Sequence, residues 1–306
     1  MDTVTFLTTL YVMVDDFCME NLAPECHCGP KASLSRSEVI TLAIFGQWER
    51  FASERDFYRF ASARLRGEFP NLPTRNQLNR LMRRHRDAIV AVGLSFAQSA
   101  TGEYEALDTL PVTVRQYKRR GWGWLAGQTD IGFSKRIASW FCGFRLLVAV
   151  SPEGQVTGFG FGPASAKDQP LAETLLALRQ TPDARLSSAG TSQAGGYYLT
   201  DKGFEGADWQ GHWRADYGAS IMHSPRRNSR CPWPREWRRR LASLRQIVET
   251  VYAKLTHTFR LHRERPHALT GFAARLAAKV ALHNFCIRLN SMLGRHPLAF
   301  ADLLGW

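Results

Sequence analysis

The sequence lacks the features of a membrane or secreted protein. No apolar run approaches the roughly 18 residues that a membrane-spanning helix requires. Residues 1–6 contain no basic side chain, so we expect no secretory signal peptide and no membrane partner. The hydrophobic content of 44% is ordinary. A chain of 306 residues therefore suits one large domain or two smaller ones with real cores.

Cysteine is scarce and scattered. Of the six cysteines, only Cys26 and Cys28, with His27 between them, are closely spaced. One C-x-C pair without a second pair is a weak pattern for zinc, so we expect no metal there. Free thiols in a reducing compartment, the cytoplasm, are the expectation.

Acidic residues are also few relative to basic ones, and the formal net charge is +13. Such an excess, most of it arginine, favours a polyanionic partner such as DNA; a generally basic, solvated surface is the alternative. The densest stretch, residues 226–240, holds seven arginines and one acid beside two tryptophans. Arginines can hold phosphates while indole rings stack on bases; a disordered basic loop is the alternative. The candidate DNA-binding residues here are Arg226, Arg227, Arg230, Trp233, Arg238 and Arg239.

Residues 1–100 favour helices and carry a second arginine cluster. Ser35 and Glu38 form a capping-box pattern before a buried helix. Thr74 begins an arginine-rich helix whose Arg, Asn and Gln side chains suit a DNA groove; a helical bundle with a merely solvated polar face is the alternative. The candidate contacts are Arg75, Arg80, Arg83 and Arg84. We expect this DNA-binding region to end at a linker, residues 93–102.

From residue 103 the pattern changes to a mixed α/β domain. We expect strands at 105–114, 138–150, 155–162, 195–200 and 219–223, a loop or hairpin at 115–136, and helices at 168–179 and 205–217. Asp168 is predicted to cap its helix. A long helix should begin at Pro234 or Leu241 and end near 259, and a last helix, 269–293, should cover the sheet. The predicted catalytic domain is therefore 103–293, with a basic insertion at about 224–240 and a tail at 294–306.

Three acids in this domain suit phosphodiester chemistry. Asp108 interrupts an apolar strand, Asp201 ends another strand, and Glu249 lies on the long helix. Active sites of open α/β sheets collect at strand ends, so we expect these carboxylates to meet. They would hold two Mg²⁺ ions, with Mn²⁺ as a substitute. Taken singly, each acid could equally be a solvent-exposed or helix-capping group.

Two basic residues lie beside these acids in the sequence. Lys202 follows Asp201 directly, and Arg245 precedes Glu249 by one helical turn. Both are candidate phosphate contacts. Arg245 could also be a structural partner that fixes the rotamer of Glu249.

Several motifs together resemble a known family. They are Leu107-Asp108-Thr109 with Pro111-Val112, Phe141-Cys142-Gly143-Phe144-Arg145-Leu146, Pro163-Ala164 with Asp168, Thr200-Asp201-Lys202-Gly203-Phe204, and Arg245-Gln246-Ile247-Val248-Glu249-Thr250-Val251-Tyr252. In this order they resemble bacterial insertion-sequence transposases of the DDE class, over roughly residues 105–290.

The resemblance implies an RNase H-like mixed sheet flanked by helices, preceded by the all-α DNA-binding region. It also implies Asp108, Asp201 and Glu249 as metal ligands, with cleavage and strand transfer at terminal inverted repeats. A homodimer or larger assembly on terminal repeats and target DNA, in the bacterial cytoplasm at the nucleoid, is the expected setting.

Two other functions remain open at this point. A stand-alone metal-dependent nuclease would use the same core without strand transfer. A non-catalytic DNA-binding protein derived from a transposase would need no acids, and the presence of all three argues against it.

Overall fold

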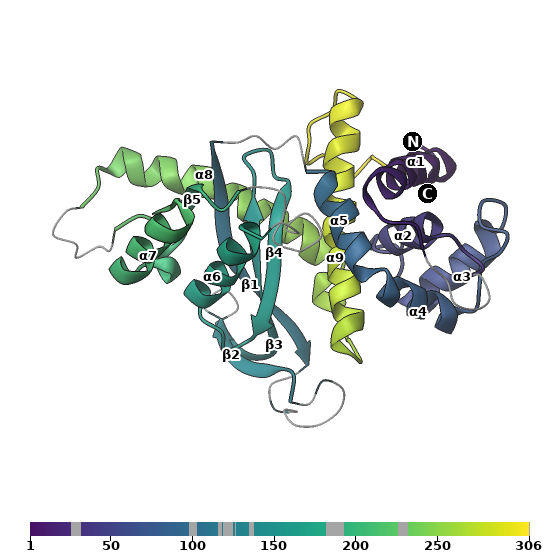
Figure 1. Ribbon diagram of the computed structural model, residues 1–306, viewed down its shortest axis with the longest axis horizontal. Coiled ribbons are helices and arrows are strands. Elements are labelled where there is room, and N and C mark those ends of the chain that lie inside the picture. The colour runs from purple at the N-terminus through teal and green to yellow at the C-terminus, as the bar shows by residue number, and fades with distance from the viewer. Residues whose placement is uncertain are drawn as a thin grey trace.

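The computed structural model describes residues 1–25, 32–97, 103–115, 118, 125, 127–134, 138–181, 193–225 and 232–305. Its helices are α1 (Thr3–Asn21), α2 (Arg36–Phe45), α3 (Glu54–Arg64), α4 (Arg75–Arg84), α5 (Arg86–Ser95), α6 (Asp168–Arg179), α7 (Ala207–Tyr217), α8 (Arg235–Ala253) and α9 (Leu269–Met292). Its strands are β1 (Tyr104–Arg115), β2 (Asp130–Ser134), β3 (Ser139–Val150), β4 (Val156–Pro163), β5 (Gly196–Leu199) and β6 (Ala219–Met222). Figure 1 shows the sheet on one side of α9 and helices α1–α4 on the other. In the part of the chain described, no helix is both long and apolar enough to cross a membrane.

The N-terminal helices begin where the sequence predicts. Ser35 and Glu38 form a complete capping box at the start of α2, and Thr74 and Gln77 form another at the start of α4. In each box the side chains satisfy backbone N–H groups that have no partner within the helix. These local signals confirm the helical character of the described residues before 97.

The linker predicted at residues 93–102 begins too early in the chain, because Gly93 lies inside α5. A Cβ atom on Gly93 would lie 2.8 Å from the Cβ of Ala281 on α9. The glycine is therefore needed for the close approach of two helices, and the prediction of a linker at 93–95 is wrong. Residues 98–102 of that segment lie outside the described part of the chain.

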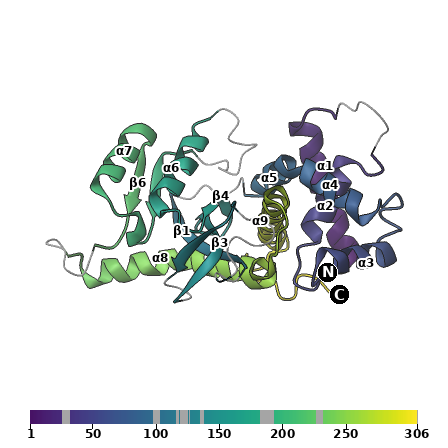
Figure 2. The same cartoon turned by 90° about the horizontal axis from the view of Figure 1, so that it is seen from below.

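The middle of helix α9, residues 276–287, is buried on all sides because the helix lies between the sheet and the N-terminal helices (Figure 2). On one side it packs against α5, and on the other its Phe272 ring stacks 4.8 Å from Phe144 of the sheet. The fully buried Asn284 donates to the carbonyls of Gly93 and Val156, each at 2.9 Å, and accepts from the Val156 N–H at 2.8 Å. The helix predicted to cover the sheet thus joins both halves of the molecule.

The sheet is mixed, with the strand order β2-β3-β1-β5-β6 and with β4 pairing with β3. Strand β3 is antiparallel to β1, β2 and β4, whereas β1, β5 and β6 are parallel. The strands predicted from the sequence are present. Strand β2 lies in the segment predicted to be a loop or hairpin, and it forms a hairpin with β3. The predicted α/β class, with helices on both faces and a helical N-terminal region, is confirmed.

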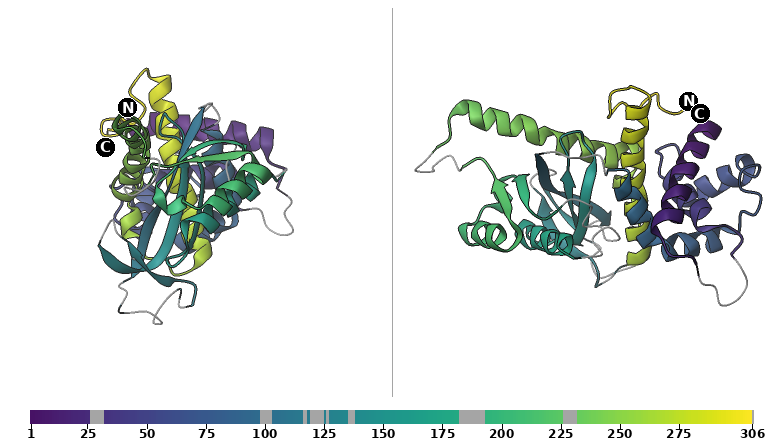
Figure 3. Two further views of the ribbon diagram at one scale, coloured as in Figure 1. Left: turned by 90° about the vertical axis from the view of Figure 1, so that its left-hand side faces the viewer. Right: turned by 45° about the horizontal axis from the view of Figure 1, so that its top comes forward.

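Two cores form on the two faces of the sheet because side chains alternate along each strand. Leu107 of β1 packs with Leu175 and Trp213 beneath α6 and α7. Ala106 and Leu110 instead face a larger core that includes α8, α9 and the N-terminal helices. Figure 3 shows α8 and the α6–α7 pair on opposite sides of the sheet.

The two described ends of the chain lie together. The Met1 amino group donates to the Leu303 carbonyl at 3.1 Å, and the Gly305 N–H donates to the Met1 carbonyl at 2.8 Å. Leu303 and Phe300 are buried in the larger core, so the segment after α9 packs against the helical region.

Candidate active site

Asp108 and Asp201 lie on neighbouring parallel strands. In the β1–β5 ladder Ala106 pairs with Leu199, and each acid lies two residues further along its own segment. Parallel neighbours are separated by about 4.8 Å, so the two carboxylates extend from adjacent backbone positions. Asp201 also accepts the Gly203 N–H at 2.7 Å and caps the short turn Lys202–Phe204. The sheet therefore brings two of the predicted acids together.

Asp108 has the most strongly perturbed carboxyl group in this region. Its side chain is 21% exposed, and burial raises its pKa to about 6, with further increases from the charges of Asp201 and Asp168. A hydrogen bond from the Thr109 N–H and the charge of Arg245 act in the opposite direction. Arg245 Nη2 lies 3.6 Å from Asp108 Oδ2. Carboxyl groups with raised pKa values that lie beside other carboxylates are typical of functional sites, including sites that bind a cation.

Asp168 supplies a further carboxylate next to this pair. Its Oδ1 accepts from Arg145 Nη1 at 2.9 Å and from the Thr109 hydroxyl at 2.8 Å. The prediction that Asp168 caps α6 is wrong, because Lys167 is the N-cap residue and Asp168 is the first helical residue. With its oxygen bonded to Arg145 and Thr109, the side chain faces the sheet rather than the N–H groups of its own helix.

At position 203 only glycine fits between the Asp168 and Asp201 carboxylates without moving them. A Cβ atom there would lie 2.4 Å from Asp168 Oδ2 and 2.8 Å from Asp201 Oδ1. Both distances are shorter than real Cβ contacts. The glycine after Lys202 thus makes room for the acidic cluster.

Glu249 lies on α8, the helix that covers the Asp108 face of the sheet. Its side chain is exposed, and it borders a surface pocket together with Ala242, Ser243, Arg245 and Gln246. Among the described residues, Arg245 pairs with Asp108 and forms no ion pair with Glu249. The predicted contact by which Arg245 would fix the rotamer of Glu249 is therefore not formed, although both residues border the same surface pocket of α8.

The donors fit a hard divalent cation, because carboxylate oxygens are the ligands that Mg²⁺ prefers. The raised pKa of Asp108 fits the same cation, since a bound positive charge would offset the burial of the carboxylate. Within the described ranges, however, no group of three or more His, Cys, Asp or Glu side chains is arranged as a metal cage. Asp108 and Asp201 are adjacent, and the exposed Glu249 is not gathered with them.

The predicted DNA-binding residues are divided between two parts of the molecule. Lys202 is exposed directly after Asp201. Trp233 lies two residues before α8, and Arg238 and Arg239 are exposed near its start. The four arginines of α4 are exposed on the other side of α9, away from the sheet (Figure 1). Arg226, Arg227 and Arg230, like Cys26, His27 and Cys28, lie outside the described residues. The described thiols of Cys18, Cys142 and Cys286 are buried and free.

The sequence did not predict that Thr109 and Arg145 contact Asp168, or that Asp168 lies beside the other two aspartates. All three residues belong to the motifs that resemble the transposase family, but no role in the acidic cluster was assigned to them. Their sequence separation hides the contact, since Thr109 and Asp168 are 59 positions apart. The motif membership was the signal that could have identified them.

Asp108 and Asp201 thus project from a pair of parallel neighbouring segments, and α8 with Glu249 covers this face of the mixed sheet. Residues 107–285 match the transposase DDE domain family, and since this is more than half of the chain, the protein belongs to that family. The predicted family and the RNase H-like fold are confirmed by this match. No curated protein and no solved structure matches the chain. The family is one of DNA-binding transposase and nuclease-type enzymes that use divalent metals.

Proposed function

We propose that this protein is the transposase of an insertion sequence, which binds terminal inverted repeats and catalyses metal-dependent DNA cleavage and strand transfer. Family membership supports the class of enzyme. The observation that carries the proposal is the partly buried Asp108 carboxyl, whose pKa is raised to about 6, beside the Asp201 carboxylate. Two acids so placed repel each other without a cation and would bind one strongly.

Asp108, Asp201 and Glu249 are proposed to hold two Mg²⁺ ions, with Mn²⁺ as a substitute. When bound, such ions activate water or a 3′-hydroxyl and offset the charge on the leaving oxygen. Asp108 and Asp201 provide the rigid part of the donor set, because Asp108 lies on β1 and Asp201 follows the paired strand β5 directly. Glu249, exposed on α8, completes the set when DNA and metal are present.

The remaining polar residues position these donors and the DNA. Arg145 and the Thr109 hydroxyl hold the Asp168 carboxylate beside the pair. Arg245 retains a buried Nε without a hydrogen-bond partner in the described residues. The partly exposed side chain of Arg245 and the exposed Lys202 are proposed to contact phosphates next to the scissile bond. The arginine-rich segment 226–240 would hold flanking DNA, and a homodimer or larger assembly would bring two ends together.

Single alanine substitutions test the acids. Asp108→Ala, Asp201→Ala and Glu249→Ala should each reduce Mg²⁺- or Mn²⁺-dependent excision of a plasmid-borne element to background, while end binding in a gel-shift assay persists. Glu20→Ala is the matched control, because Glu20 is an exposed acid on α1, outside the site, and should leave excision unchanged.

Wild-type cleavage by the Asp201→Ala protein would contradict the assignment of the site. The products also separate the alternative functions. Strand-transfer products identify a transposase, cleavage alone identifies a stand-alone nuclease, and binding without either identifies a non-catalytic DNA-binding protein.

A further inference from the structure

A basic groove of about 690 Å³ lies where the N-terminal helices meet the segment that precedes α9. Arg55 of α3 and Arg75 and Arg83 of α4 border it from one side. Arg263 and Arg265 border it from the segment after α8. All five of these side chains are exposed residues. Arginines from distant parts of the sequence therefore line one continuous depression.

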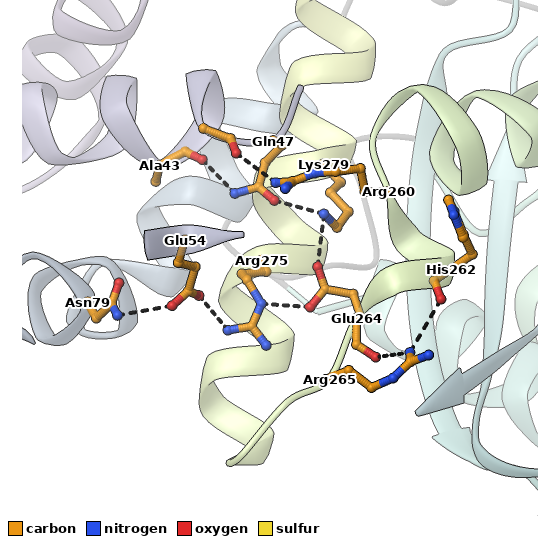
Figure 4. A network of polar contacts seen from close by, with 11 residues as sticks. Ala43, Gln47, Glu54, Asn79, Arg260, His262, Glu264, Arg265, Arg275 and Lys279 are labelled. Carbon is orange, nitrogen blue, oxygen red and sulfur yellow. Dashed lines mark hydrogen bonds and ion pairs between the residues drawn. The ribbon is translucent and has the colours of Figure 1, made fainter. Parts of the chain in front are cut away.

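The acids of the groove are already paired with other groups (Figure 4). Glu264 contacts Arg275 at 2.7 Å and Lys279 at 2.9 Å, and these two cations hold the pKa of its buried carboxyl down to about 2. Glu54 contacts Arg275 at 2.7 Å and Asn79 at 3.0 Å. The carboxylates are thus occupied by the inner cations.

Four of the five outer arginines have no carboxylate partner among the described residues, and Arg263 reaches Glu49 only at 3.9 Å. Among the described residues, Arg55 and Arg75 have no ion-pair partner, and Arg83 bonds only to the Asn79 carbonyl of its own helix. Their positive charge is available to an anion in the groove.

Arg260 gives an independent indication of an anionic ligand. It borders the same groove but is only 7% exposed, and it adopts a left-handed backbone conformation with φ of 59°. Its Nη2 donates to the Gly46 carbonyl at 3.0 Å, whereas its Nε has no partner in the described part of the chain. Burial of this guanidinium lowers its pKa. The charge of Glu264 offsets only part of this burial, so a further anion in the groove would stabilise the guanidinium.

Two of the three amide side chains of α4 are engaged within the protein, and the third, Asn76, does not line the groove. Gln77 is part of the capping box with Thr74, and Asn79 donates to Glu54. Readout of adenine depends on a free amide side chain, which the exposed part of the groove does not offer among the described residues, whereas phosphate contacts need only positive charge. The groove therefore favours backbone contacts over recognition of sequence.

We infer that this groove holds the phosphate backbone of duplex DNA without reading its base sequence. The inference rests on the proposed function, because it assumes that DNA is the substrate. The segment with Arg260, Arg263 and Arg265 follows α8, the helix that carries Arg245 and Glu249. DNA in the groove would thus link the N-terminal helices to the helix beside the acids.

Charge-matched triple variants test this inference. The groove variant is Arg55→Gln, Arg75→Gln and Arg265→Gln. The control variant is Arg66→Gln, Arg214→Gln and Arg288→Gln, which removes three exposed arginines outside the groove lining and the same net charge. Thermal melting of both variants checks that they fold like the wild-type protein.

Binding is measured by fluorescence anisotropy with two labelled duplexes of unrelated sequence, in EDTA and at several salt concentrations. If each arginine contacts one phosphate, the slope of the logarithm of the binding constant against the logarithm of the salt concentration should become less steep by about 2.7 in the groove variant. The control should change by less than about 1. The affinity of the groove variant should fall equally for both duplexes.

Three results would overturn the inference: equal loss in both variants, an unchanged slope in the groove variant, or loss for one duplex only. Displacement of the duplex by millimolar inorganic phosphate at constant ionic strength would show a small-anion site instead. Because EDTA prevents cleavage, this test is independent of the acids. If the groove variant binds DNA like the control while the wild type excises normally, the inference about the groove is refuted and the proposed function stands. If the groove variant binds more weakly as expected but the wild type shows no excision, the proposed function is refuted and the groove stands.

Discussion

Replacing Asp108 with asparagine should stabilise the metal-free protein while it removes cleavage. Burial raises the pKa of Asp108 from 3.8 to about 6, so the folded state disfavours the charged carboxylate. Each pKa unit corresponds to about 1.4 kcal/mol, and ionised Asp108 therefore lowers the free energy of unfolding at pH 7 by about 3 kcal/mol. Asparagine keeps an acceptor for the Thr109 N–H and carries no charge.

The sign of the pH dependence follows from the raised pKa. The unfolded carboxyl ionises near 3.8 and the folded one near 6, so the loss of stability grows as the pH rises through this interval and is constant above it. The free energy of unfolding of the Asp108→Asn protein should exceed that of the wild type by about 1.5 kcal/mol at pH 5 and by about 3 kcal/mol at pH 7.

Urea denaturation in EDTA at the two pH values measures this difference. Asp208→Asn, at an exposed acid of α7, is the control and should match the wild type at both. A repeat in Mg²⁺ should stabilise the wild type more than the Asp108→Asn protein. An asparagine variant less stable than the wild type at pH 7, or a difference independent of pH, would refute the reasoning.

Two further substitutions test other contacts. Gly203→Ala should reduce excision but leave duplex binding intact, because its Cβ displaces the Asp168 and Asp201 carboxylates; an alanine protein with full activity would show that this packing is not needed. His283 is fully buried, donates from Nε2 to the Gly154 carbonyl at 2.8 Å, and has a pKa lowered by burial to about 4. Since the unfolded histidine binds a proton near 6.5, the protein should lose about 3 kcal/mol between pH 6.5 and pH 4. His283→Gln should flatten this part of the stability profile in urea denaturation, and an equally steep profile would exclude His283 as its cause.

Local features of the fold could be predicted from the sequence because their causes lie within a few residues. The capping boxes at Ser35 and Thr74 are examples, as is the turn at Gly154, where a positive φ of 90° suits glycine. The alternation and aromatic content of the strands likewise depend on neighbouring residues. The same is true of the motif around Asp201, which was sufficient to suggest the family.

Contacts between distant segments could not be predicted in this way. Gly93 was assigned to a linker because glycine often interrupts helices, but its real constraint is Ala281 on another helix. Asp168 was assigned to a helix cap, but Arg145 and Thr109 hold it at the acidic cluster. Neither partner is encoded by spacing along the chain.

The sequence by itself determined the secondary structure elements, the positive charge and the acids that identify the family. Only the tertiary structure decided which of these acids lie together. The β1–β5 register sets Asp108 beside Asp201, while the docking of α8 pairs Arg245 with Asp108 and leaves Glu249 exposed. The packing of α3 and α4 near α9 likewise forms the arginine groove. The physical reason is that strand order and helix docking follow from burial of the whole apolar surface, which no short stretch of sequence specifies.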